Sequence, residues 1–65
     1  MKGTVADFDA HVGLGVVRAE DGRELPFHCT QLSDGTRAIE LGTLVQFQVV
    51  AGHQGRWEAA RVEKL

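Results

Sequence analysis

The alternation of apolar and polar residues is clearest between Leu44 and Val50. There Val45, Phe47 and Val49 are separated by single glutamines, so one side of an extended chain is apolar and the other is polar. A period of two residues is typical of a β-strand with one buried face. No stretch of about eleven residues carries the apolar stripe of an amphipathic helix. The pattern therefore predicts an all-β protein.

Eight glycines divide the chain into short apolar segments of strand length. The segments predicted as strands are Thr4–Phe8, Leu14–Ala19, Glu24–Cys29, Leu44–Val50 and Trp57–Val62. Asp21-Gly22 predicts a hairpin between the second and third, because glycine tolerates a positive φ. The longest connection, residues 30–41, is too polar for a strand but has room for a helical turn. Five short antiparallel strands are typical of a small barrel, which we expect to be closed because open sheet edges are sticky.

Composition and charge narrow the class of protein. The chain has 65 residues, which we expect to form a single domain over residues 1–65. Cys29 is the only cysteine, so no disulfide within the chain is possible and a reducing cytoplasm is the expected location. No apolar run approaches the roughly 20 residues of a membrane span, so we expect no membrane association. The net charge of −2 argues against a strong, purely electrostatic hold on nucleic acid.

An ordered series of residues along almost the whole chain resembles the cold-shock domain. The matching positions are Gly3, Thr4, Val5, Phe8, Gly13, Gly15, Phe27, His28, Gly42, Val45, Phe47, Gly52, Gly55, Ala59, Ala60 and Val62. The order and spacing of the series carry the resemblance, since a lone Gly-x-Gly is not specific. The resemblance implies a five-stranded antiparallel barrel of the OB type.

The resemblance also implies a nucleic-acid-binding face on the second and third strands. In that family, outward aromatic rings stack on unpaired bases, and nearby Lys or Arg side chains follow the phosphates. The corresponding motifs here are Val12-Gly13-Leu14-Gly15-Val16-Val17 and Leu25-Pro26-Phe27-His28-Cys29. This chain replaces most of the expected side chains. Residues other than Phe occupy the positions where Phe is expected, namely Leu14, Val16, Pro26 and Cys29.

Further replacements lie on the first strand and just before the second. Asp7 occupies the position of a usual Trp, and Ala6 and Val12 occupy positions of usual Lys residues. Only Phe8 and His28 remain as rings. The scaffold of the family is therefore kept while most of its stacking surface is lost.

Two functions follow from this altered face. The first is binding of single-stranded RNA or DNA, weak and with low sequence specificity, with apolar contacts from Leu14 and Val16 and stacking by His28. The alternative is a protein–protein interaction module, in which Leu14, Val16, Pro26 and Cys29 form an exposed apolar patch. A third interpretation gives these residues no role beyond the sheet. The mostly apolar replacements favour a partner surface over simple decay of the site.

The candidate nucleic-acid-binding residues combine the remaining rings, the apolar replacements and scattered cations. They are Lys2, Phe8, Leu14, Val16, His28, Arg37 and Trp57. Phe8 is equally suited to packing at the barrel rim. Trp57, the only Trp, is either a replacement stacking surface or a cap on the barrel end, and we favour the cap. Arg56 is a further candidate for a phosphate contact, and Pro26, which has no N–H, predicts a local break in strand pairing.

The sequence gives no sign of catalytic or metal chemistry. His28 and Cys29 are neighbours on one predicted strand and so point to opposite faces, which does not suit a nucleophile and its base. His11, His28 and His53 lack the spacing of a zinc site, and one cysteine cannot supply the remaining ligands. No paired carboxylates or phosphate-binding loop are recognisable. We expect no enzyme activity, cofactor, metal or small-molecule substrate.

Overall fold

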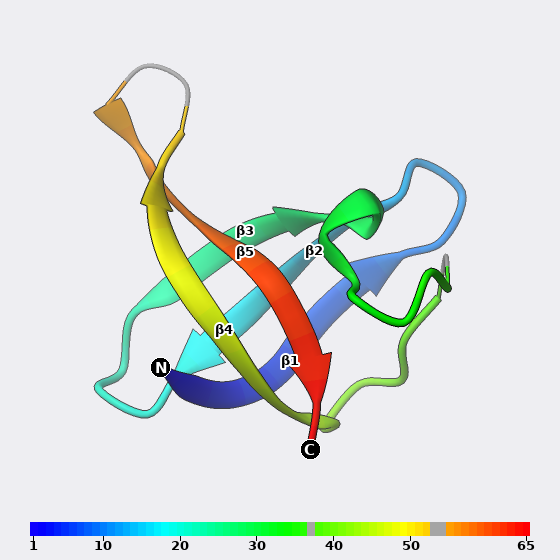
Figure 1. Cartoon of the computed structure of the whole chain (residues 1–65), viewed down its shortest axis with the longest axis horizontal. Helices are drawn as coiled ribbons and strands as arrows, with labels where there is room; N and C mark the ends of the chain where they lie inside the picture. The colour runs from blue at the N-terminus through cyan, green and yellow to red at the C-terminus, as the bar shows by residue number, and fades with distance from the viewer. Residues whose placement is uncertain (37, 53–54) are drawn as a thin grey trace.

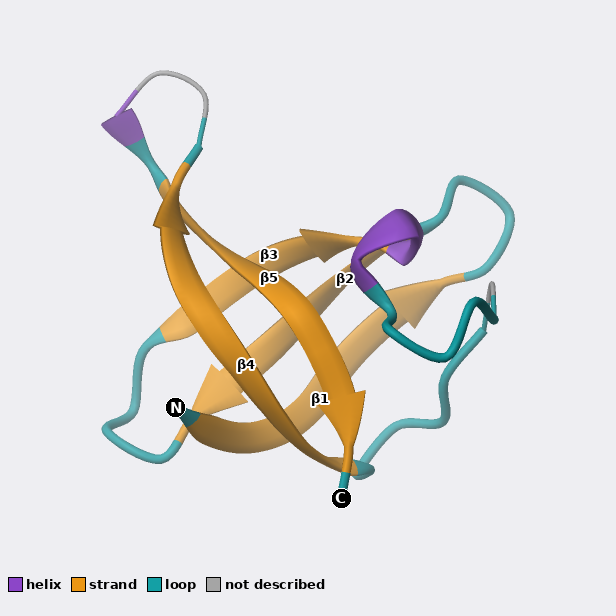
Figure 2. Ribbon diagram, viewed as in Figure 1, coloured by secondary structure: helices purple, strands orange, loops and turns teal. Residues whose placement is uncertain are grey.

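The protein is all-β in its computed structural model, which describes residues 1–36, 38–52 and 55–65. Its elements are β1 (Lys2–Asp9), β2 (Leu14–Ala19), β3 (Glu24–His28), the 3₁₀ turn η1 (Cys29–Gln31), β4 (Leu44–Ala51) and β5 (Trp57–Lys64) (Figures 1 and 2). The five predicted strands are confirmed, with small shifts in their bounds. The third strand ends one residue earlier than predicted, because the chain turns into η1 at Cys29.

The strands form one antiparallel sheet in the order β3-β2-β1-β4-β5. The connection after η1 takes the chain from β3, at one end of the sheet, to β4, which pairs with the start of β1 at Lys2–Thr4. In Figure 1 the β4–β5 hairpin crosses in front of β1, β2 and β3. The sheet thus coils over itself and encloses one core.

The core is built from the alternating positions of the strands. Val45 and Phe47 of β4 are fully buried while Gln46 and Gln48 between them are exposed, as their alternation predicts. Buried apolar side chains among the described residues are Val5, Val17, Ala19, Leu25, Phe27, Cys29, Leu32, Ile39, Val45, Phe47, Ala59 and Val62. No buried polar or charged side chain occurs among these described residues.

Two bulges bend the sheet. In β1 the register shifts between Val5 and Asp7, so Ala6 has no partner on β2. In β5 a second shift falls opposite Phe47, and there Arg61 takes a φ of +51°. An extra residue in one strand sharpens its local twist, which a sheet this small needs in order to coil.

The barrel is closed by packing rather than by a continuous ladder of hydrogen bonds. Strands β3 and β5 are the ends of the hydrogen-bonded sheet, and they are in contact with each other. Beyond η1, Leu32 forms a parallel bridge with Val62, and the Ser33 N–H donates to the Val62 carbonyl at 2.9 Å. The molecule therefore has the closed shape that we expected of an OB-type barrel. Along the contact between β3 and β5, however, side-chain packing takes the place of ladder hydrogen bonds.

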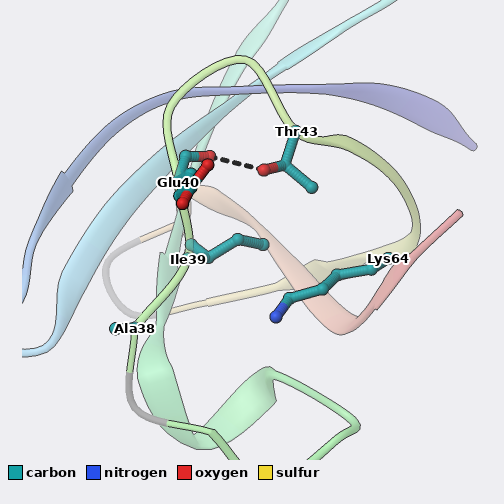
Figure 3. Close-up of a pocket in the computed structure, with 5 residues that line it drawn as sticks. All are labelled: Ala38, Ile39, Glu40, Thr43 and Lys64. Carbon is teal, nitrogen blue, oxygen red and sulfur yellow. Dashed lines mark hydrogen bonds between the residues drawn. The ribbon is translucent and has the colours of Figure 1, made fainter.

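The loop before β4 covers one end of the barrel. Ile39 is 8% exposed and joins the core, while the Thr43 hydroxyl donates to the Glu40 carbonyl at 2.7 Å (Figure 3). A cavity of about 500 Å³ at this end is lined by Ala38, Ile39, Glu40, Thr43 and Lys64. The Lys64 ammonium is paired with the Asp34 carboxylate at 3.1 Å, so it stabilises this end of the fold. No helix in the described part of the chain is long and apolar enough to cross a membrane.

Candidate nucleic-acid interface

The outward face of β1, β2 and β3 is organised in three transverse rows. Each row takes one residue from each strand, at directly paired positions. The rows are Asp9–Leu14–His28, Asp7–Val16–Pro26 and Thr4–Arg18–Glu24. The intervening rows face the core, since Val17, Leu25 and Phe27 are buried.

The register between β2 and β3 makes the outward pairs close neighbours. The Ala19 N–H donates to the Arg23 carbonyl at 2.8 Å, and the Cys29 N–H donates to the Gly13 carbonyl at 2.7 Å. These two bonds show that the odd-numbered residues of β2 are the ones that form hydrogen-bonded pairs with β3. Pro26 therefore occupies a non-hydrogen-bonded position, where a missing N–H costs no ladder bond. Pairing continues through Pro26, so the predicted break does not occur.

Leu14, Val16 and Pro26 form a continuous outward surface, called here the apolar strip. Leu14 is 54% exposed, Pro26 is exposed and Val16 is half-buried between its neighbours. Leu14 and Val16 thus lie on the face that the sequence indicated. Apolar side chains at these positions give contact area but no ring to stack on a base.

His28 lies beside Leu14 at one end of the apolar strip, and its orientation is fixed. Its Nδ1 accepts from the Thr30 backbone N–H at 3.2 Å and lies 3.0 Å from the Thr30 hydroxyl oxygen, so the ring caps η1. A neutral ring that accepts at Nδ1 carries its proton on Nε2. His28 therefore offers an ordered ring with one remaining donor.

Cys29 does not belong to this surface, contrary to the sequence-based interpretation. It is 7% exposed, lies in η1 and packs in the core. Gly13 leaves room for it, since a Cβ at Gly13 would lie 2.8 Å from the Cys29 Sγ. The buried thiol is 3.9 Å from His28 Nδ1. It is a core residue, not part of an apolar patch.

Phe8 also faces away from the apolar strip. It pairs with Gly15, whose β3 partner is the buried Phe27, and the Phe8 and Phe27 rings stack with centroids 5.9 Å apart. The bulge at Ala6 causes this orientation, because one extra residue reverses the side to which the following side chains point. Phe8 thus packs at the barrel rim, which is one of the two roles considered for it.

Carboxylates border the apolar strip on its β1 side. Asp7 Oδ1 accepts from the Phe8 N–H at 2.9 Å, and Asp9 Oδ1 accepts from the His11 N–H at 3.0 Å. In the third row, Arg18 is paired with Glu24 at 2.9 Å. Sequence inspection singled out Asp7 but missed Asp9, although its spacing of two residues from Asp7 was a visible signal. This side of the face repels phosphate.

The remaining candidate residues do not gather with the apolar strip. Lys2 begins β1 at the opposite end and lines a separate groove with Leu44 and Leu65. Trp57, which we favoured as a cap on the barrel end, leaves 56% of its surface exposed. It lines a groove with Pro26 and Arg56. Arg37 lies outside the described residues.

The described residues contain no group of three or more His, Cys, Asp or Glu side chains arranged to hold a metal ion.

Comparisons with known proteins agree with this architecture. The family model described as "'Cold-shock' DNA-binding domain" matches residues 1–65. The chain is 38% identical over 66 residues to the cold shock-like protein CspC of Bacillus cereus, covering 100% of both chains. It is 37% identical over 65 residues to the cold shock protein CspA of Staphylococcus aureus (strain USA300), covering 98% of this chain and 97% of that one.

A solved structure, "drosophila Unr CSD456", superimposes with a TM-score of 0.80 at 32% identity. The match covers 98% of this chain and 26% of that longer one. The sequence match and the fold agree over the full set of strands. The chain therefore belongs to the cold-shock DNA-binding domain family.

Proposed function

We propose that the chain binds single-stranded RNA or DNA, weakly and with low sequence specificity, on the outward face of β2 and β3. The observation that carries the proposal is the continuity of the apolar strip with the ordered ring of His28. Stacking and apolar contact with bases do not depend on base identity, because every base has a π-face. Membership of the family supports nucleic acid as the ligand.

Low affinity follows from the side chains on this face. Each base that stacks on an aromatic ring contributes about 1–3 kcal/mol, and Leu14 and Val16 supply no such ring. Asp7 and Asp9 add repulsion on the β1 side, and Arg18 is already paired with Glu24. We expect a dissociation constant that is micromolar or weaker.

A second candidate function is docking of a protein partner on the same face. The apolar strip and the carboxylates of Asp7 and Asp9 favour it, since an apolar surface with an acidic border suits a partner that carries basic residues around an apolar centre. This function does not require rings on the strip.

Fluorescence anisotropy of a labelled oligothymidylate of about eight nucleotides, titrated with the full chain at several salt concentrations, tests the proposal. We expect a micromolar dissociation constant. The logarithm of the association constant should fall with the logarithm of the salt concentration at a slope of about −0.7 to −2, as one to three phosphate contacts require. Absence of binding at low salt would favour the protein partner. A tight complex with a steep slope would contradict the proposed mode.

We propose that the chain is a binding module that acts in the cytoplasm, without catalysis, cofactor or small-molecule substrate. The free, buried thiol of Cys29 is compatible with a reducing compartment. Its burial, together with the capping role of His28, gives this pair a structural use.

A further inference from the structure

A groove lies where the two end strands of the sheet meet. It has a volume of about 420 Å³ and is lined by Arg23, Glu24, Leu25, Pro26, Arg56 and Trp57. Trp57, the first residue of β5, leaves 56% of its surface exposed at this place. Exposed Trp side chains are costly to keep in water and are enriched at binding surfaces.

The groove is continuous with the apolar strip. Pro26 belongs to both, since it ends the row of Asp7 and Val16 and also lines the groove beside Trp57. A ligand lying across β2 and β3 therefore reaches the Trp57 side chain as it passes the outer edge of β3.

The charges at the two edges of this continuous surface are opposite in sign. Asp7 and Asp9 border it on β1, whereas Arg23 and Arg56 line the groove at the far edge. Arg56 forms no ion pair with any described residue. Arg23 is paired with Asp21 at 2.9 Å and is partly neutralised. A polyanion is repelled from the β1 edge and attracted to the β5 edge.

The groove also contains one carboxylate, that of Glu24. It accepts from the Arg18 guanidinium at 2.9 Å, which balances its charge locally. Arg56 therefore remains the uncompensated charge beside the exposed indole.

We propose that one base of a single-stranded nucleic acid stacks on Trp57 in this groove while an adjacent phosphate contacts Arg56. The nucleic acid then crosses β2 and β3 and enters the groove between β3 and β5, away from β1, where Asp7 and Asp9 would oppose it. This inference rests on the proposed function and adds the location of the principal stacking residue.

Trp57 is the only tryptophan, so its fluorescence reports on this groove alone. The full chain is titrated with an unlabelled oligothymidylate of about eight nucleotides, and anisotropy of the labelled strand is measured in parallel. We expect quenching of Trp57 that saturates at the same concentration as the anisotropy signal.

Variants of the full chain sharpen the test. Trp57→Ala should weaken binding by about fivefold to a hundredfold, and Trp57→Phe should restore most of it, because a ring is retained. Arg56→Gln should reduce the salt slope by about 0.7. Leu41→Ala removes another exposed apolar side chain outside the groove and should leave binding unchanged.

The contrary outcomes separate the two proposals. If anisotropy shows binding but Trp57 is not quenched, and Trp57→Ala binds with full affinity, the groove is not the binding site while the proposed function stands. Absence of any anisotropy signal at low salt would overturn both. Wild-type quenching requires no variant, so misfolding of Trp57→Ala would not obscure the answer.

Discussion

At the scale of single residues, Gly15 leaves room for the rim residue Phe8 to stack on the core residue Phe27. A Cβ at this position would lie 2.6 Å from the Phe27 ring, which stacks on Phe8. We expect Gly15→Ala to lower the free energy of unfolding by about 1–3 kcal/mol, because close-packed rings must shift. Urea denaturation measures the change. Val16→Ala, at the next position but on the outward face, should cost less, and equal losses would contradict this packing argument.

His28 combines a structural role and a proposed binding role that substitution can separate. His28→Ala should lower the free energy of unfolding by about 1 kcal/mol through loss of the cap on η1, and should weaken oligothymidylate binding about fivefold or more. His28→Asn keeps a capping acceptor and should retain stability, yet bind as weakly as His28→Ala. Thermal unfolding and anisotropy provide the two measurements. If His28→Asn binds oligothymidylate as tightly as the wild type, the His28 ring does not contact the ligand.

The orientation of individual side chains could be predicted from the sequence only in part. Strict alternation from Val5 places Phe8 outward, and the bulge at Ala6 reverses it, because a bulge leaves no clear mark in a single sequence. Cys29 illustrates the opposite case. Alternation from Leu25 and Phe27 places it inward, as the structure has it, whereas the position of a Phe in the family suggested an exposed residue.

At the scale of elements, β2 carries the side chains through which the proposed binding can be strengthened. Leu14→Phe combined with Val16→Phe places two rings on the outward face, and we expect at least a tenfold gain in affinity for oligothymidylate. Anisotropy measures the gain once size-exclusion chromatography has shown a monomer, since exposed rings favour aggregation. Unchanged affinity in a folded monomer would mean that bases do not lie across β2.

Cys29→Phe is the matched comparison for that double substitution. It places a ring at another position where the family pattern expects Phe, but in this chain the side chain is in the core. Overpacking there should destabilise the fold by about 1–3 kcal/mol without improving binding.

The strands themselves were predictable because each has one apolar side or a continuous apolar run between glycines. The grouping of Trp57, Arg56 and Pro26 was not. It depends on β3 and β5 meeting at the ends of a coiled sheet, a contact between segments about 30 residues apart in sequence. Arg56 and Trp57 attracted notice individually, but alternation within a strand carries no information about which strands become neighbours.

At the scale of the whole molecule, Asp34 links the loop after η1 to β5. Hydrogen bonds from the Thr36 hydroxyl and N–H, followed by the Lys64 ammonium, lower the pKa of Asp34 to about 2 from 3.8. A lowered pKa means that the ionised form stabilises the folded state, fully above about pH 4, and that this contribution disappears as the pH falls through about 2.

We therefore expect Asp34→Asn to be less stable than wild type at pH 6, with the difference shrinking between about pH 4 and pH 2. Unfolding midpoints of both proteins at a series of pH values measure it, and the subtraction removes the titration of the other carboxylates. A difference that stays constant down to pH 2 would show that the ionised carboxylate is not the stabilising species.

The overall architecture was accessible from the sequence through the ordered series of glycines and apolar residues. The distribution of charge over the molecule was not, since a net charge of −2 does not say that Asp7 and Asp9 border one edge of the face and Arg56 the other. That distribution arises from the transverse rows, which exist only after the strands have paired.

The meeting line of β3 and β5 also affects whether copies of the protein associate with one another in concentrated solution. Strands that end a sheet have main-chain groups through which copies of a protein can associate edge to edge and assemble into fibrils. Pro26 has no N–H on the outer side of β3, so an incoming strand meets an interrupted row of donors. Pro26→Val restores the donor and should increase light scattering on heating. Unchanged scattering would mean that packing by β5 protects this edge without help from the proline.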